Sequence, residues 1–118
     1  MRDVNLTFTT NGSGAATATT AVLPYCRLVA IEWLDGDLAD GVDAVFKVTG
    51  RASGIDRTIL TLTDANADAF YNVTNAVVST AGAAVTDGWA HPIIDGKISV
   101  TLNDGGSVKT GGAILFLE

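Results

Sequence analysis

Apolar and polar residues alternate along several short segments of this chain, and this alternation restricts its fold more than any other feature. It begins at residues 4–9, where Val, Leu and Phe take turns with Asn and Thr. The same spacing returns at 42–48, 97–103 and 113–117. A repeat of two residues places alternate side chains on opposite faces of a β-strand, so that one face can be buried. The pattern predicts an all-β chain.

Turn signals divide these segments at short intervals. The chain holds 13 glycines, and only 17% of its residues are charged, whereas exposed helix faces are normally filled with Lys, Glu and Arg. Asp-Gly pairs favour the tight turns that join neighbouring strands. We therefore expect an antiparallel β-sandwich or jelly roll of about seven or eight strands, forming one domain over residues 1–118. The Asp-Gly pairs begin at Asp35, Asp40, Asp87, Asp95 and Asp104.

Individual segments carry more local predictions. Residues 4–9 and 15–23 flank a glycine-containing turn at 10–14, which predicts a hairpin. Residues 26–34 are apolar on both faces, as expected of a central strand that is covered on each side. Residues 64–92 mix Ala, Asn and Asp with poor helix formers, and there we expect an irregular excursion with one short strand or helix.

Charge and hydropathy exclude several classes of protein. The net charge of −6 repels phosphate backbones, so we expect no binding to nucleic acid. Apolar runs stay far below the roughly 18 residues that a membrane span requires, and we expect no membrane partner. The first residues alternate instead of forming an apolar core, which predicts that the chain has no cleaved export signal. Cys26, the only cysteine, lies in an apolar run and is expected to be a buried thiol.

No group of residues in the sequence points to catalysis. His91 is the sole histidine, and a triad would have to combine it with Cys26 or with a serine. No serine lies in a Gly-x-Ser-x-Gly context. We therefore expect a protein that is not an enzyme and has no catalytic residue.

Glycine-rich cofactor loops of the Gly-x-Gly-x-x-Gly or Walker type are not found in the sequence. The late glycines flank the last predicted strand and lie near no predicted helix start, so we interpret them as turns. We expect no cofactor. These glycines are residues 105, 106, 111 and 112.

Acidic residues concentrate at 35–43, where four carboxylates fall within nine residues. Carboxylate oxygens are calcium ligands, but the spacing differs from that of a calcium-binding EF-hand loop. Asp and Gly are also the residues that turns between strands use. A turn is the interpretation we favour, and no metal ligand is assigned, while a metal site in this loop stays open as the alternative.

Three residues are candidates for contact with a partner protein: Tyr71, Trp89 and His91. Trp89 lies beside an Asp-Gly pair in the irregular region, and interfaces favour Trp, Tyr and Arg. A Trp folded over the end of the sandwich is the alternative. With no chemistry visible elsewhere, we expect the function to lie in the protein's surfaces.

The overall pattern resembles the small decoration (cement) proteins encoded in the head gene cluster of tailed bacteriophages. The resemblance covers nearly the full chain and rests on turns and alternating segments. These segments are Leu6–Ala18, Ala39–Ala44, Pro92–Val100 and the stretch from Gly105-Gly106 through Gly111-Gly112 to Glu118.

The resemblance implies a virion structural protein on the outer capsid surface, made in the host cytoplasm. Its partner would be the major capsid protein, and it would be a homo-oligomer, a trimer, that stabilises the capsid without a cofactor. Two alternatives remain open from the residues themselves. One is a receptor- or glycan-binding module, a common use of jelly rolls, and the other is a phage tail or connector subunit.

Overall fold

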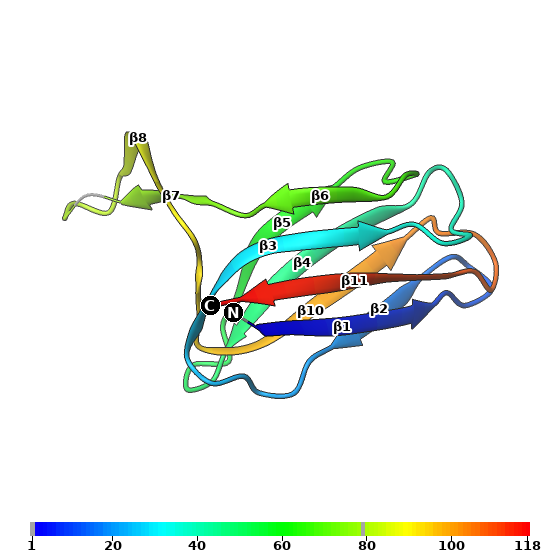
Figure 1. Cartoon of the computed structure of the whole chain (residues 1–118), viewed down its shortest axis with the longest axis horizontal. Coiled ribbons are helices and arrows are strands. Elements are labelled where there is room, and N and C mark those ends of the chain that lie inside the picture. Colours follow the sequence, from blue (N-terminus) through cyan, green and yellow to red (C-terminus); the bar gives the residue numbers. More distant parts are fainter. Residues whose placement is uncertain (1, 79) are drawn as a thin grey trace.

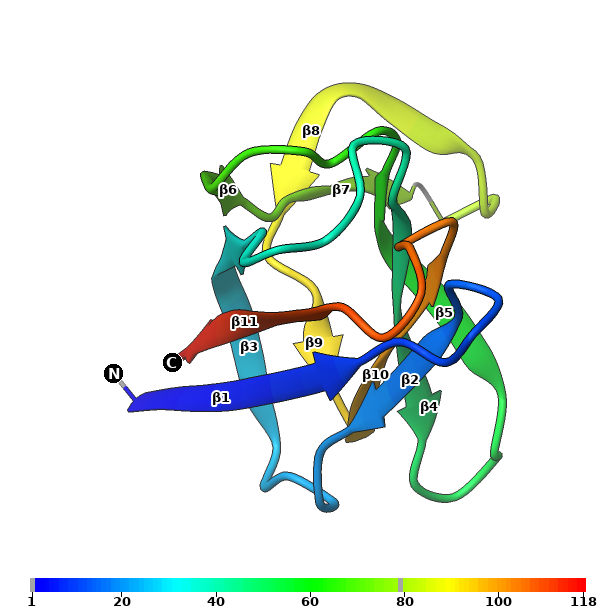
Figure 2. The same ribbon diagram turned by 90° about the vertical axis from the view of Figure 1, so that its right-hand side faces the viewer.

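Two antiparallel sheets packed face to face form the body of the protein, in a computed structural model that describes residues 2–78 and 80–118 (Figure 1). The first sheet contains β1 (Arg2–Thr9), β11 (Thr110–Leu117), β3 (Cys26–Leu34), β6 (Ala69–Asn72) and β9 (Ile93–Ile94). The second contains β2 (Ala16–Thr19), β10 (Gly96–Asn103), β4 (Asp43–Gly50) and β5 (Asp56–Leu62). Figure 2 shows the two sheets on opposite sides of the molecule.

The strands pair from the ends of the chain inward. β1 pairs with β11, β2 with β10, β3 with both β6 and β9, and β4 with β5, and every one of these ladders is antiparallel. A long hairpin wrapped in this way into two sheets is a jelly roll. The orders β1-β11-β3-β6 and β2-β10-β4-β5 follow from the wrapping. The predicted all-β sandwich is confirmed, and its two sheets hold eight strands in the described residues when β6 and β9 count as one interrupted strand.

The core lies between the sheets and is filled by the alternate residues that the sequence pattern marks. Phe46 on β4, Val100 on β10 and Leu115 on β11 are all fully buried. Trp33 of β3 stands at the centre, where its ring stacks on Phe8 at 5.5 Å between ring centroids and meets Phe46 edge-on at 6.3 Å. β3 is central in its sheet, as the sequence predicts, because it lies between β11 and β6. The prediction that it is covered on each side is wrong, because only its inner face is packed against the second sheet and its outer face carries Arg27 and Glu32.

The predicted hairpin between residues 4–9 and 15–23 is wrong. β1 and β2 belong to different sheets, and each pairs with a strand from the other end of the chain. The intervening turn bends around Asn11, whose Oδ1 accepts the backbone N–H groups of Ser13 and Ala15 at 2.9 and 3.1 Å. The turn carries the chain across the edge of the sandwich, from one sheet to the other.

The Asp-Gly pairs also differ from the prediction, because none of them forms the turn of a hairpin within the sandwich. The consecutive sandwich strands that pair are β4 and β5, and their turn at 51–55 contains no Asp-Gly. Asp35, Asp40 and Asp104 begin pairs in loops that connect the two sheets. Gly96 instead opens β10, where an added Cβ would lie 1.9 Å from the carbonyl oxygen of Thr49. The glycine is needed there because the neighbouring strand approaches too closely for a side chain.

Gly111 and Gly112, interpreted as turn residues from the sequence, lie inside β11. An added Cβ on Gly111 would meet the Leu38 side chain at 2.6 Å, so the Leu38 loop closes over this end of the core. Gly112 faces the opposite side of the sheet, between Thr7 and Leu34 of the neighbouring strands. Its missing side chain leaves a hollow on the outer surface.

The largest departure from the prediction concerns residues 64–92. In place of one short element, this segment contains β6, β7 (Asn75–Val78) and β8 (Ala84–Ala90). β7 and β8 pair with each other as a two-stranded sheet of their own, which projects beyond one end of the sandwich (Figure 1). We call residues 74–91 the arm.

The arm interrupts a single edge strand. At its base the Val73 N–H donates to the Val29 carbonyl oxygen at 3.0 Å, and the Leu28 N–H donates to the Pro92 carbonyl oxygen at 3.1 Å. Val29 and Leu28 are adjacent on β3, so the chain leaves the sheet after Val73 and returns to it at Pro92. β6 and β9 therefore lie in line beside β3, and the arm is an insertion between them.

Candidate protein interface

The outer faces of the two sheets differ in chemistry. On β10, in the second sheet, Lys97, Ser99 and Thr101 alternate with the buried core residues and face outward. On β11, in the first sheet, the corresponding outward residues are Gly112, Ile114 and Phe116. The first sheet therefore presents a row of apolar side chains along β11, flanked by Asp3 on β1 and Glu32 on β3, on a face that no other element of the described chain covers as a layer. Apolar side chains bordered by polar and charged ones are typical of a site of interaction.

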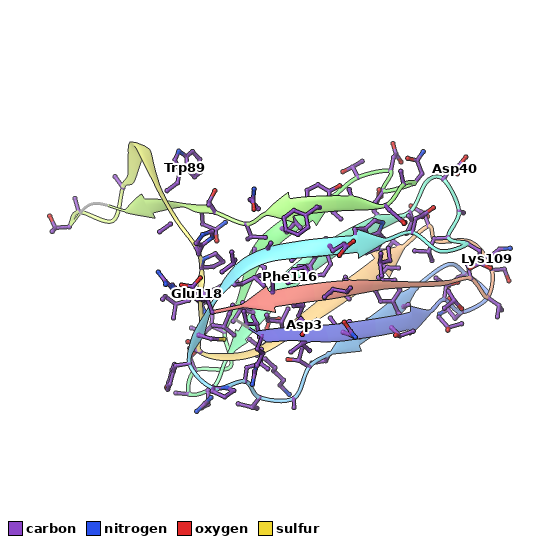
Figure 3. All side chains as sticks on the ribbon, in the orientation of Figure 1. Asp3, Asp40, Trp89, Lys109, Phe116 and Glu118 are labelled. Atoms are coloured by element: carbon purple, nitrogen blue, oxygen red, sulfur yellow. The ribbon has the colours of Figure 1, made fainter. Side chains whose placement is uncertain are left out.

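Two aromatic rings meet on this face. Phe70 of β6 and Phe116 of β11 have ring centroids 5.7 Å apart, although β3 lies between their strands. The β3 residue paired with Phe116 is Ala30, which is only 2% exposed even though it faces outward. The small alanine lets the rings close over the strand. We call Phe70 and Phe116 the aromatic pair. Phe70 remains 58% exposed, and Figure 3 shows Phe116 on β11.

The hollow left by Gly112 lies on the same face, toward the end of the molecule opposite the arm. It has a volume of about 360 Å³ and extends from the row of Thr7, Gly112 and Leu34 toward Ile114. None of the residues that line it carries a charge. We call this depression the glycine hollow.

The three predicted contact residues take different positions. Trp89 lies on β8 in the arm and is 62% exposed, as a contact residue must be. His91 is half-buried at the base of the arm, with its Nδ1 atom 2.7 Å from the carbonyl oxygen of Val73. Tyr71 pairs with the inward-facing Ile31 and packs against the core. The structure does not bring the three residues together into one patch.

Sequence reasoning did not single out Phe70, Ile114 and Phe116, the apolar residues of the outer face, of which Phe70 is exposed and the other two are half-buried. Alternation could have indicated them, since residues between two inward-facing positions of a strand point outward. Phe116 lies between Leu115 and Leu117 in this way. What alternation could not indicate is that Phe70 and Phe116 lie close together, because that depends on the pairing of three strands.

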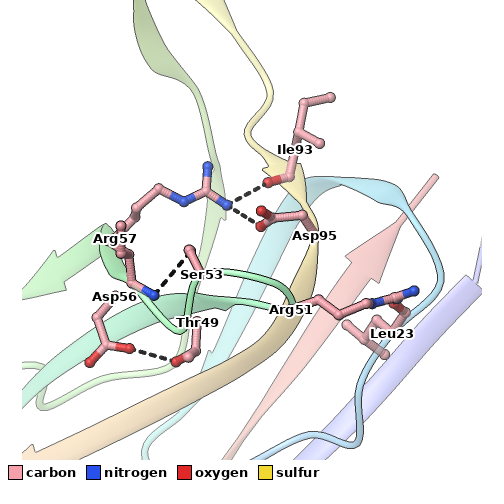
Figure 4. Close-up of polar contacts among 9 residues, drawn as sticks. Leu23, Thr49, Arg51, Ser53, Asp56, Arg57, Ile93 and Asp95 are labelled. Carbon is pink, nitrogen blue, oxygen red and sulfur yellow. Dashed lines mark hydrogen bonds and ion pairs between the residues drawn. The ribbon is translucent and has the colours of Figure 1, made fainter.

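Basic side chains at the arm end of the sandwich are used in internal contacts. Arg57 of β5 forms an ion pair with Asp95 and also donates to the carbonyl oxygen of Ile93 at 3.3 Å (Figure 4). Arg51 donates to the carbonyl oxygen of Leu23, and its guanidinium lies 4.8 Å from the centre of the Tyr25 ring. The Arg57 contacts hold β5 against the segment that leads into β10, and the Arg51 contacts hold the β4–β5 turn against the β2–β3 connection.

Carboxylates in the acidic loop at residues 35–43 and beside it accept hydrogen bonds from backbone N–H groups. Asp37 Oδ1 accepts the Thr110 N–H at 2.6 Å, and Asp43 Oδ1 accepts the Asp64 N–H at 3.0 Å. In the same way, Asp68 Oδ1 accepts the Asp35 N–H at 2.8 Å. Within residues 2–78 and 80–118, no three His, Cys, Asp or Glu side chains lie close enough to hold a metal ion. Asp37 and Asp43 therefore accept backbone hydrogen bonds as residues of a turn do, in agreement with the interpretation of this loop as a turn.

Asp35 is the member of this loop whose environment disfavours its charge. Its Oδ1 atom is buried and has no hydrogen-bond partner among the described residues. Burial raises the pKa of this carboxyl, and the neighbouring carboxylates of Asp68, Asp40 and Asp37 raise it further. Cys26, predicted as buried, is half-buried; burial raises the pKa of its thiol, and Arg2 opposes that rise.

Asp35→Asn should make the fold more stable at pH 7. A carboxyl with a raised pKa in the folded state adds stability while protonated, below the unfolded value of 3.8, and that stability is lost as the pH rises through the folded pKa. The neutral amide avoids this loss, so the gap between variant and wild type should narrow as the pH falls toward 4. Urea unfolding across this range measures the gap. Asp104→Asn removes an exposed loop carboxylate as a control; an equal gain from it would contradict a local effect at Asp35.

Comparison with protein-family models, with curated protein sequences and with solved structures finds no match for this chain. No helix among the described residues is long and apolar enough to cross a membrane. The site is therefore defined by its own geometry: an apolar sheet face with an aromatic pair, a glycine hollow at one end of it and an arm at the other.

Proposed function

We propose that this chain is a non-enzymatic virion structural protein that decorates a bacteriophage capsid. In this proposal several copies, as a trimer, bind the lattice of the major capsid protein on the outer surface of the head and stabilise it. The observation that carries the proposal is the contact between Phe70 and Phe116 on the outer face of the first sheet, with Phe70 58% exposed. The resemblance of the chain to phage decoration proteins supplies the identity of the partner.

The two faces of the sandwich suit this role. Aromatic side chains contribute much of the binding energy in many protein interfaces, and Phe70 and Phe116 lie together on the outer face. The opposite face carries Lys97, Ser99 and Thr101, which can stay in solvent. A repeating lattice offers many identical sites, so that linked copies bind much more tightly than one copy alone.

Sedimentation with phage heads tests this proposal. Heads assembled from the cognate major capsid protein without this chain should bind the purified protein and carry it into the pellet. Replacing both rings, Phe70→Ser and Phe116→Ser, should weaken that binding at least about 10-fold, because truncation of central aromatic anchors has effects of this size. Ile55→Ser is the control, since Ile55 is an apolar residue of the β4–β5 turn that is 63% exposed. A wild-type protein that stays in the supernatant would overturn the proposal.

Glycan binding is a second candidate, favoured by one observation. Trp89 and Phe70 expose 62% and 58% of their surface, and flat aromatic faces of this kind can stack on sugar rings. This reading predicts that a defined oligosaccharide binds the free chain and that Trp89→Ala abolishes the binding. A glycan array on which the chain binds no glycan would contradict this second candidate function.

A further inference from the structure

The arm is too small to be stable without a partner. Its strand β7 has four residues, and its ladder runs from the pair Asn75 and Ala90 to the pair Val78 and Ala84, with an irregularity between them. An isolated two-stranded hairpin is marginal at best in water, and stable sheets need a third strand or a packed face. None of the core residues that the structure describes lies in the arm. Its exposed position is thus best explained by contact with another molecule.

The chemistry of the arm restricts what that molecule can be. Across residues 74–91 the sequence has one carboxylate, Asp87, and no Lys or Arg, and it is rich in Ala and Val. Trp89 is the large side chain of the arm that the structure describes, and it is well exposed. The arm therefore fits a surface that is apolar and uncharged.

The glycine hollow is such a surface, and it lies on the same chain. Its lining is uncharged, although the protein has 13 acidic and 7 basic residues. Its volume of about 360 Å³ exceeds the cavity of about 150 Å³ that holds a benzene ring in another protein, so an indole ring has room. It lies near Lys109 and Thr110, whereas Trp89 lies at the other end of the long axis (Figure 3).

We propose that the arm of one copy binds the next copy head to tail, with Trp89 seated in the glycine hollow of that copy. The contact rests on the part of the proposed function in which several copies of the chain assemble together. Two different surfaces meet in it, so the contact is heterologous, and repetition closes it into a ring when the rotation allows. Each copy then offers one arm and one hollow.

Charge favours a second copy as the occupant. A net charge of −6 makes copies repel one another through most of their surface. The arm and the glycine hollow are parts of the chain where that repulsion is weak, because one has a single carboxylate and the other has no charged lining residue. Because one chain carries both the arm and the glycine hollow, each copy can bind the next copy through the same two surfaces.

Mass measurement of four full-length variants tests the contact. Wild type should have a mass above the 12.1 kDa of one chain, rising with concentration. Trp89→Asp in the arm and Thr7→Glu in the hollow should each raise the dissociation constant at least about 30-fold, the loss expected when a central tryptophan contact is removed. Thr7 is exposed on the edge strand β1, so the change leaves the core intact. The controls are Ile55→Asp, whose side chain is 63% exposed, and Thr17→Glu on β2.

Mixing the two disrupted variants gives the decisive result. Thr7→Glu retains an intact arm and Trp89→Asp retains an intact hollow, so an equal mixture of the two monomers should form a complex of two chains. A symmetric contact between two arms predicts no such rescue, and Thr7→Glu would then assemble like wild type. Either of those results, or a wild-type protein that stays monomeric at millimolar concentration, would overturn the contact.

Fluorescence gives a second readout that depends on Trp89. The other tryptophan, Trp33, is fully buried, so a blue shift in emission with rising concentration reports the burial of Trp89. The shift should be missing in Thr7→Glu and return when Trp89→Asp is added. Because no phage head is present in these measurements, their failure leaves the capsid-binding proposal to its own sedimentation test.

Discussion

Trp33→Ala is expected to lower the free energy of unfolding by about 3–5 kcal/mol, the range seen when a large core aromatic is truncated. Trp33 is 0% exposed and contacts both Phe8 and Phe46, which come from opposite sheets. Its Nε1–H also donates to the carbonyl oxygen of Ala65 at 3.0 Å, and the variant leaves that acceptor without its partner. Domains are stable by only about 5–15 kcal/mol, so this loss is a large fraction of the total free energy of unfolding. Urea unfolding followed by circular dichroism measures the loss.

Two further substitutions distinguish the contribution of the Trp33 ring to stability from that of its hydrogen bond, and from the general effect of removing a tryptophan. Trp33→Phe keeps an aromatic ring between Phe8 and Phe46 but loses the N–H group, so it should cost less than Trp33→Ala. Trp89→Ala removes the same side chain from an exposed position and should change the free energy by no more than about 0.5 kcal/mol in the monomer. Equal losses at the two tryptophans would contradict the position of the core.

The individual strands could be predicted because alternation is a local property. In β4, β10 and β11 the residues that alternate in the sequence are the residues that alternate between core and surface in the structure. Because one face of each strand is buried, apolar residues occur at every second position of the sequence.

The pairing of the strands could not be predicted in this way. β1 and β11 form a ladder from Arg2 with Leu117 to Thr9 with Thr110, at opposite ends of the sequence. No local signal records such a pairing, and the Asp-Gly pairs pointed to hairpins between neighbours instead. These turns connect the two sheets, and Asn11 caps one of the crossings with its side chain. A jelly roll replaces local hairpins with pairs formed across the whole chain.

The candidate interface was predicted in part, for the same reason. Trp89 was identified by residue type, and the structure exposes it. Tyr71 was chosen by type as well, but the pairing of β6 with β3 turns it toward the core and leaves its neighbour Phe70 outside. The aromatic pair exists because Ala30 of the intervening strand leaves space for two rings. A contact across three strands is visible only once their register is known.

Replacement of residues 74–91 by two glycines should leave the sandwich folded while assembly of the chain is lost. Val73 and Pro92 are held by the adjacent residues Val29 and Leu28, so a short linker can join them along the edge of β3. A proline fits this edge, where its missing N–H is not needed, and it favours an extended conformation for the residue before it. None of the core residues that the structure describes is removed, and the shortened connection costs less entropy, so the free energy of unfolding should change by less than about 1 kcal/mol.

Two measurements on this shortened chain distinguish an effect on folding from an effect on association. Circular dichroism and urea unfolding should match the wild-type protein, whereas the mass in solution should be that of a single chain at every concentration. Mixed with Thr7→Glu, the shortened chain should form a complex of two chains, because it retains the hollow that an intact arm needs. A loss of the fold on deletion would show that the arm stabilises its own sandwich, and a shortened chain that still assembles would show that the copies meet elsewhere. The arm is therefore expected to contribute to association and not to folding, because the edge strand it interrupts is held by β3 on both sides of the insertion.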